Sequence, residues 1–414
     1  MPSFKTAFWL KFSVFNLFIV SVLGLIMRYK IGFEFPYFDQ KHLQESHSHF
    51  AFTAWISHTL MVLMIAYLEK KISKENLVFK ANLYNKIITL NLLCSFAMLL
   101  SFMFTGYGVI SIIFSTLSLL VSLLFGYTFI KDSALLSAKN LVLKWFRAAI
   151  FFNVISSFGT LALAYMMITK NLYQNEYLAS IYYYLHFQYN GWFFFACMGL
   201  LYHFLNIEIC TNRVFNNTFN LFFLACIPTY LLSILWMQLP IWLYFLGVFG
   251  AFIQVCTWFY FIINLKSKKQ QLQNSSFLLR YILLFVAFAL SLKLLLQLGS
   301  TIPYVSKLAF GFRPIVIAYL HLVLLAIITL FLLFYIYVNK YLKVFKPIKY
   351  GIVIFSIGVI FNEVTLAVQG IASFDYFVIP YVNELLFAAA FIMSFGILIT
   401  ALFSIQNTEN KQPL

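Results

Sequence analysis

Charged side chains are scarce in this sequence of 414 residues, because only 10% are Asp, Glu, Lys or Arg, whereas soluble domains average about 25%. Hydrophobic residues make up 63% of the chain, and the mean hydropathy is +0.90. A water-soluble core could not bury so much apolar surface, so the lipid bilayer is expected to be the solvent. In hydrocarbon every backbone polar group must be paired within its own segment, which favours long helices. The fold class expected is an all-α polytopic membrane protein.

Acidic residues and paired cysteines are also few, but neither feature indicates a nucleic-acid-binding protein or a protein stabilised by disulfides or bound metal. The net charge is +16, but the basic residues lie between apolar runs and form no clustered face, so no nucleic-acid partner is expected. The five cysteines lie in or beside apolar runs with no Cys-x-x-Cys pair, so they are expected to pack as small apolar residues. No long polar stretch divides the chain, so residues 1–414 are predicted to form a single transmembrane domain.

Long apolar runs recur along the whole chain. A helix that crosses about 30 Å of hydrocarbon needs about 20 residues, and twelve runs have roughly that length. They lie at residues 7–27, 47–68, 84–105, 108–131, 143–168, 178–206, 214–238, 240–264, 277–298, 313–338, 347–371 and 380–405. The sequence therefore predicts a bundle of twelve transmembrane helices.

The positive charges alternate in density from one connection to the next. With the N-terminus inside, the inner segments hold 21 of the 28 Lys and Arg residues, the outer loops hold six, and Lys293 lies within the ninth helix. Positive charge is retained on the cytoplasmic side of membranes. Both termini are therefore predicted to be cytoplasmic, in a bacterial-type inner membrane.

Four of the seven histidines fall in even-numbered helices, which enter the membrane from the outer face. His47 and His49 open the second predicted helix, His186 lies in the sixth and His321 in the tenth. Each is expected within about ten residues of the outer end. Imidazole is a common metal ligand, whereas an interface residue or an interhelical hydrogen bond is the alternative. His47 and His49 point about 200° apart on a helix, so one metal cannot bind both.

Three histidine motifs resemble those of a known family. They read His-Ser-His-Phe-Ala-Phe-Thr-Ala-Trp from His47 to Trp55, His-Phe-Gln-Tyr-Asn-Gly-Trp from His186 to Trp192, and Tyr-Leu-His-Leu from Tyr319 to Leu322. Together with the helix number, they resemble the catalytic subunit of the haem-copper oxidase superfamily, nearest to the nitric oxide reductase branch. The resemblance implies haem b bound by His47 or His49 together with His321, and a second metal bound by His186. It also implies electron transport with an electron donor or other respiratory-chain subunits.

The sequence departs from this family at the second metal site. Residues 214–264 contain no histidine, although the family carries two adjacent histidines there, and Tyr319 stands where the family has the first histidine of a His-x-His pair. The site for copper or non-haem iron is therefore predicted to be degenerate. One bis-histidine haem for electron transfer or sensing would remain, and enzymatic activity is left open.

Three charged residues of the predicted helices are further candidates. Lys293 and Glu363 could relay protons or charge, and Lys293 could hold a haem propionate, or the two could form a structural ion pair. Arg313 precedes His321 by about two turns, so it could bind a propionate, or it could simply reach the membrane interface.

Other functions fit the same sequence. Twelve helices are also common in secondary transporters, although the sequence shows no pair of matching interrupted helices. An active oxidase or nitric oxide reductase with unconventional ligands around His186 is a second alternative. An assembly factor that retains the scaffold without a cofactor is a third.

Overall fold

The structure, a computed structural model, describes residues 3–171, 173–209, 213–265, 276–306, 312–374 and 377–405. Its described elements are all helices, and the only β contact in those ranges is an isolated bridge between Asn140 and Ile209. The chain divides into two compact units. Unit 1 comprises Met1–Leu136, Leu332–Ala372 and Tyr376–Leu414, and unit 2 comprises Ser137–Phe331 and Ser373–Asp375.

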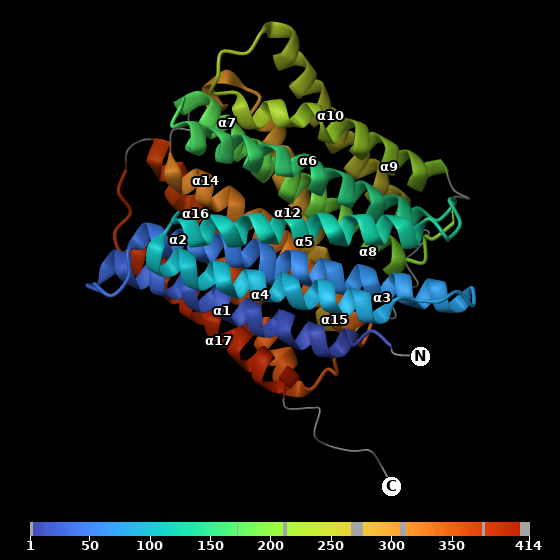
Figure 1. The fold of residues 1–414 in the computed structure, drawn as a ribbon. Coiled ribbons are helices and arrows are strands. Elements are labelled where there is room, and N and C mark those ends of the chain that lie inside the picture. The colour runs from blue at the N-terminus through green and yellow to red at the C-terminus, as the bar shows by residue number, and fades with distance from the viewer. Residues whose placement is uncertain are drawn as a thin grey trace. The chain divides into compact units, whose positions relative to one another are not determined.

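Unit 1 is built from both ends of the chain. Its helices are α1 (Thr6–Gly32), α2 (Gln40–Phe50), η1 (Ala51–Ser57), α3 (His58–Lys74), α4 (Ala81–Thr105), α5 (Val109–Ser133), α15 (Leu330–Val338), α16 (Lys346–Phe374) and α17 (Val382–Ile405). The first and last helices, α1 and α17, pack side by side (Figure 1). Helix α4 packs against α2 and α5. The N-terminal and C-terminal segments of the sequence therefore share one core.

Unit 2 contains the middle of the chain. Its helices are α6 (Leu141–Thr169), α7 (Gln174–His186), η2 (Phe187–Phe193), α8 (Phe194–Phe204), α9 (Arg213–Cys226), η3 (Pro228–Ile234), α10 (Ile241–Asn264), α12 (Phe277–Gly299), α14 (Arg313–His321) and η5 (Leu322–Thr329). Helix α6 packs along α7, η2 and α8, while α10 packs against α9, η3 and α12. Helix α12 also contacts η5.

Ten helices of the described residues are long and apolar enough to cross a membrane. They correspond to ten of the twelve predicted segments, and the chain is a multi-pass membrane protein. The seventh predicted segment is the pair α9 and η3, which bends by 42°. The sixth is the continuous helix formed by α7, η2 and α8, whose polar centre around Gln188 lowers its hydropathy. The number of twelve crossings stays a prediction.

The second helix starts earlier than the apolar run predicts. It begins at Gln40, because the Asp39 side chain accepts hydrogen bonds from the backbone N–H groups of Lys41 (2.8 Å) and His42 (3.0 Å). Such an N-cap satisfies donors that the first turn leaves unpaired, and the bond from His42 is the main cause that lowers the pKa of Asp39. The sequence predicted that His47 and His49 open this helix. They instead lie in the last turn of α2, because the helix begins at Gln40.

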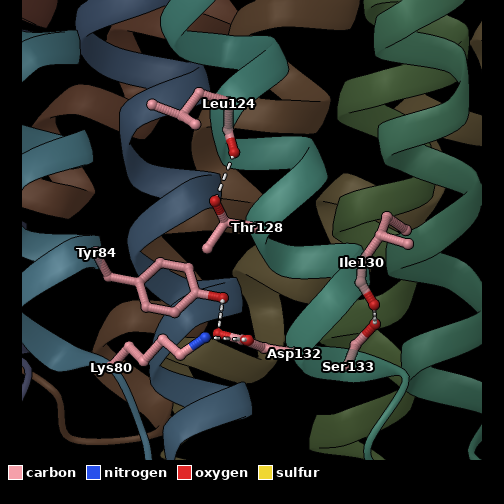
Figure 2. A network of polar contacts seen from close by, with 7 residues as sticks. All are labelled: Lys80, Tyr84, Leu124, Thr128, Ile130, Asp132 and Ser133. Carbon is pink, nitrogen blue, oxygen red and sulfur yellow. Dashed lines mark hydrogen bonds and ion pairs between the residues drawn. The ribbon is translucent and has the colours of Figure 1, made fainter.

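A polar cluster connects the ends of α4 and α5 in unit 1 (Figure 2). The Tyr84 hydroxyl donates a hydrogen bond to the Asp132 carboxylate (3.0 Å), and Lys80 forms an ion pair with the same carboxylate (3.8 Å). Asp132 is 4% exposed. A buried carboxylate needs such partners, so this cluster acts as a structural connection between the two helices.

Candidate functional site

The three helices that carry the candidate histidines share an unusual backbone feature. In each of them a π-helical stretch follows the histidine-bearing turn, as η1 after α2, η2 after α7 and η5 after α14. His47 and His49 lie in the last turn of α2, and His186 and His321 end α7 and α14. π-helical turns are rare and often lie at functional sites. The histidines therefore sit at local departures from α-helix, which hydropathy alone could not indicate.

The backbone of η1 is stabilised by asparagine side chains of neighbouring helices. Asn16 of α1 donates to the carbonyl oxygen of Ala54 (2.8 Å), and Asn91 of α4 donates to that of Thr53 (3.3 Å). Both asparagines are buried. Irregular backbone is tolerated at membrane depth only where protein groups satisfy it. These two asparagines were not singled out from the sequence, although amides inside apolar runs were a signal for them.

The His47 side chain has the arrangement typical of a ligating histidine. Its Nδ1 lies 3.1 Å from the carbonyl oxygen of Val20 in α1. Because a carbonyl only accepts, Nδ1 carries the proton, and Nε2 keeps its lone pair. Ligating histidines commonly donate their other N–H to such a backbone oxygen. His47 is a partly exposed residue, and α1 approaches its ring at Gly24, where an added Cβ would lie 3.4 Å from the ring.

The His49 side chain points to another neighbour, as the 200° separation from His47 requires. Its ring stacks on Phe102 of α4, with centroids 4.3 Å apart and an interplanar angle of 6°. Its Nε2 hydrogen-bonds with the Tyr107 hydroxyl (3.1 Å). One ring face and the Nε2 of His49 are thus already engaged, whereas His47 is bonded through Nδ1.

His186 has both ring nitrogens bonded to protein groups. Its Nε2 donates to the carbonyl oxygen of Cys226 (2.9 Å), and its Nδ1 accepts from the Asn190 amide (3.1 Å). Asn190 in turn lies 2.6 Å from the ammonium of Lys293. A metal ion at His186 would have to displace one of these bonds. Within the described ranges, no three His, Cys, Asp or Glu side chains form a group that could hold a metal.

The structure brings Lys293 close to His186, which the sequence did not predict. Lys293 is 5% exposed and donates to the amide oxygens of Asn190 (2.6 Å) and Gln297 (2.5 Å). Glu363 lies in unit 1 and accepts a hydrogen bond from Asn362 (3.1 Å). The alternatives of an ion pair and of a relay between Lys293 and Glu363 therefore stay predictions.

The remaining candidates lie on α14. Arg313 is exposed and opens the helix with Pro314 next to it, and His321 ends it as a partly exposed residue. Tyr319 contacts Tyr189 of η2, with ring centroids 6.2 Å apart. This contact joins the sixth and tenth predicted helices within unit 2.

Two comparisons with known proteins return no relative from which a function could be transferred. No model of a known protein family matches the chain, and no curated protein has a matching sequence. The resemblance to haem-copper oxidases therefore stays an expectation, which rests on the three histidine motifs and the predicted number of helices.

Proposed function

We propose that this multi-pass membrane protein binds haem b through His47 and acts in electron transfer or redox sensing. The observation that carries the proposal is the hydrogen bond from His47 Nδ1 to the Val20 carbonyl, which leaves the Nε2 lone pair of this partly exposed residue as a possible ligand. Haem bound there would supply one-electron transfer. An electron donor or another respiratory-chain subunit would be its partner.

The chain's own residues have separate parts in this proposal. Val20 orients the His47 ring, and Gly24 of α1 lies next to that ring. His321 belongs to unit 2, so its part as a second ligand stays a prediction from the sequence, which its own alanine variant tests. Lys293 is already bonded to Asn190 and Gln297, so we keep Arg313 as the candidate for the haem propionates.

An optical spectrum of the purified, detergent-solubilised protein tests the proposal. Reduced protein should show an intense Soret band and the sharp α-band of six-coordinate haem b. His321→Ala should convert the spectrum to that of five-coordinate haem or remove it. A monodisperse, folded protein that stays colourless after expression with haem supplied would contradict the proposal.

A second candidate function is secondary transport, which one feature of unit 2 favours. Transporters place binding sites at broken helices near the bilayer midplane. The Cys226 carbonyl, at the break between α9 and η3, is linked to the buried Lys293 by hydrogen bonds through His186 and Asn190. A colourless protein in which Lys293→Cys reacts with a membrane-impermeant thiol reagent would support this function over haem binding.

The proposed orientation places both termini and the lysine-rich connections in the cytoplasm. In a variant without the five natural cysteines, Lys170→Cys should react with an impermeant maleimide on intact cells, because its loop is expected outside. Lys74→Cys should react only after the cells are opened. Both lysines are exposed, and the reverse labelling pattern would refute the orientation.

A further inference from the structure

Six buried polar side chains of unit 2 are joined by hydrogen bonds that lead to Lys293 from two sides. They come from five helical segments, and each is at most 9% exposed: His186, Asn190, Thr229, Gln254, Lys293 and Gln297. We refer to them as the lysine ring. Polar groups at membrane depth are costly unless paired, and here each is paired with another.

The first arm of the lysine ring runs from the Cys226 carbonyl to Lys293 through His186 and Asn190. The carbonyl can only accept, so His186 Nε2 donates to it at 2.9 Å and His186 Nδ1 must accept. Asn190 therefore turns its NH₂ group to Nδ1 (3.1 Å) and its oxygen to the Lys293 ammonium (2.6 Å). The orientation of the Asn190 amide is thus set by a backbone carbonyl.

The second arm returns to the same carbonyl through Thr229, Gln254 and Gln297. The Thr229 hydroxyl shares its single proton between the carbonyl oxygens of Ala225 (2.9 Å) and Cys226 (3.0 Å), and its oxygen accepts from Gln254 (3.3 Å). The oxygen of Gln254 then accepts from Gln297 (3.0 Å), whose own oxygen faces Lys293 (2.5 Å). Every donor in both arms points away from Lys293.

The break between α9 and η3 explains why the Cys226 carbonyl accepts side chains. Pro228 has no backbone N–H, and the N–H of Tyr230 bonds to Ile227 (3.1 Å), so it does not close an α-helical turn onto Cys226. A carbonyl released by a broken helix needs another donor. His186 and Thr229 supply two.

We infer that the lysine ring is a cation site, occupied in this chain by the ammonium group of its own Lys293. Two amide oxygens face one point, and both amides are held in that orientation by hydrogen bonds that end on a backbone carbonyl. Residues 137–331 contain only two acidic residues, Glu176 in the first turn of α7 and Glu208 beyond α8. The site thus binds positive charge through neutral oxygens, as carbonyl groups do for monovalent cations in membrane proteins.

The ligand class that the site accepts is a monovalent cation with N–H donors, of which a primary alkylammonium is the simplest. Lys293→Ala removes the tethered ammonium and leaves room for n-propylammonium, which restores the missing atoms. The midpoint temperature of unfolding in detergent should fall in Lys293→Ala and rise with added n-propylammonium. Choline, which has no N–H, should have no effect at equal ionic strength, and sodium chloride tests whether an alkali cation also binds.

The matched control is Lys293→Met, which has a similar volume but no donor and no charge. Lys293→Met should be less stable than the wild type and insensitive to n-propylammonium, because its side chain fills the site. The inference is overturned if n-propylammonium and choline shift Lys293→Ala equally, if neither shifts it, or if Lys293→Met is as stable as the wild type.

A second variant decides the case if the Lys293 variants do not fold. Gln297→Glu places a carboxylate beside Lys293, so it should fold with a midpoint at or above that of the wild type if Lys293 is a cation. The same substitution beside a neutral group would bury an unpaired charge and lower the midpoint strongly. Gln297→Leu serves as its control, because it loses the same bond to Gln254 without adding charge. A Gln297→Glu protein less stable than Gln297→Leu contradicts the inference, whatever the haem content of either.

Discussion

Replacing His47 with glycine is expected to remove haem from the purified protein and with it the Soret band. The His47 Nε2 lone pair is the proposed bond to iron, and its direction is set by the 3.1 Å hydrogen bond from Nδ1 to Val20. Glycine within a helix costs about 1 kcal/mol, so the fold should persist. Imidazole added to the His47→Gly protein should then restore haem binding, because it can occupy the space that the missing side chain leaves.

The control for this experiment is His49→Gly, which is two residues away in the same turn. Its ring packs on Phe102 and bonds Tyr107, so its removal should leave the spectrum of the bound haem in place. Haem lost from His49→Gly and kept in His47→Gly would show that His49, and not His47, is the ligand. Haem kept in both variants would place the ligand elsewhere in the chain.

Gly396→Ala is expected to destabilise unit 1 by about 3 kcal/mol or more, at the upper end of the range for overpacked cores. Helices α16 and α17 approach each other through their backbones, and an added Cβ at Gly396 would lie 2.5 Å from Phe355 N and 2.7 Å from Gly351 O. These are backbone atoms, which cannot move without displacing a helix. Small residues at such crossings allow membrane helices to pack closely.

Thermal unfolding in detergent, followed by size-exclusion chromatography, measures this effect. Gly32→Ala is the matched control, because Gly32 lies in α1 of the same unit and an added Cβ there meets no atom within 4 Å. Gly32→Ala should leave the midpoint unchanged or raise it slightly, since alanine favours helix. Equal stability of Gly396→Ala and Gly32→Ala would show that α16 and α17 do not pack as closely as described.

Hydropathy predicted most of the helices, because each crossing must be long and apolar whatever its neighbours are. The tenth segment, 313–338, is observed as one continuous run of helix from Arg313 to Val338. The second segment, 47–68, lies within the longer helix from Gln40 to Lys74. The difference arises from the polar turn that Asp39 caps, which a window of apolar residues does not detect.

Helical periodicity also predicted part of the site. The angle of about 200° between His47 and His49 requires different neighbours, and the structure places Val20 beside one and Phe102 beside the other. Which ring would suit a ligand depended on α1 and α4, so periodicity left that choice open. The hydrogen-bond partners in unit 2 were even harder to predict from the sequence, because Asn190 and Lys293 are 103 residues apart in the chain.

By itself, the sequence determined the solvent of this protein, the helical class and the positions of most apolar helices, because these follow from local composition and the length of each run. Only the tertiary structure decided where those helices depart from α-helix and which polar side chains meet. Asn16 and Asn91 donate hydrogen bonds to carbonyl oxygens of the π-helical stretch η1, and His186 donates one to the Cys226 carbonyl at the break before Pro228. Each of these hydrogen bonds joins groups at least 38 residues apart, so their formation depends on the packing of distant helices and cannot be read from local sequence.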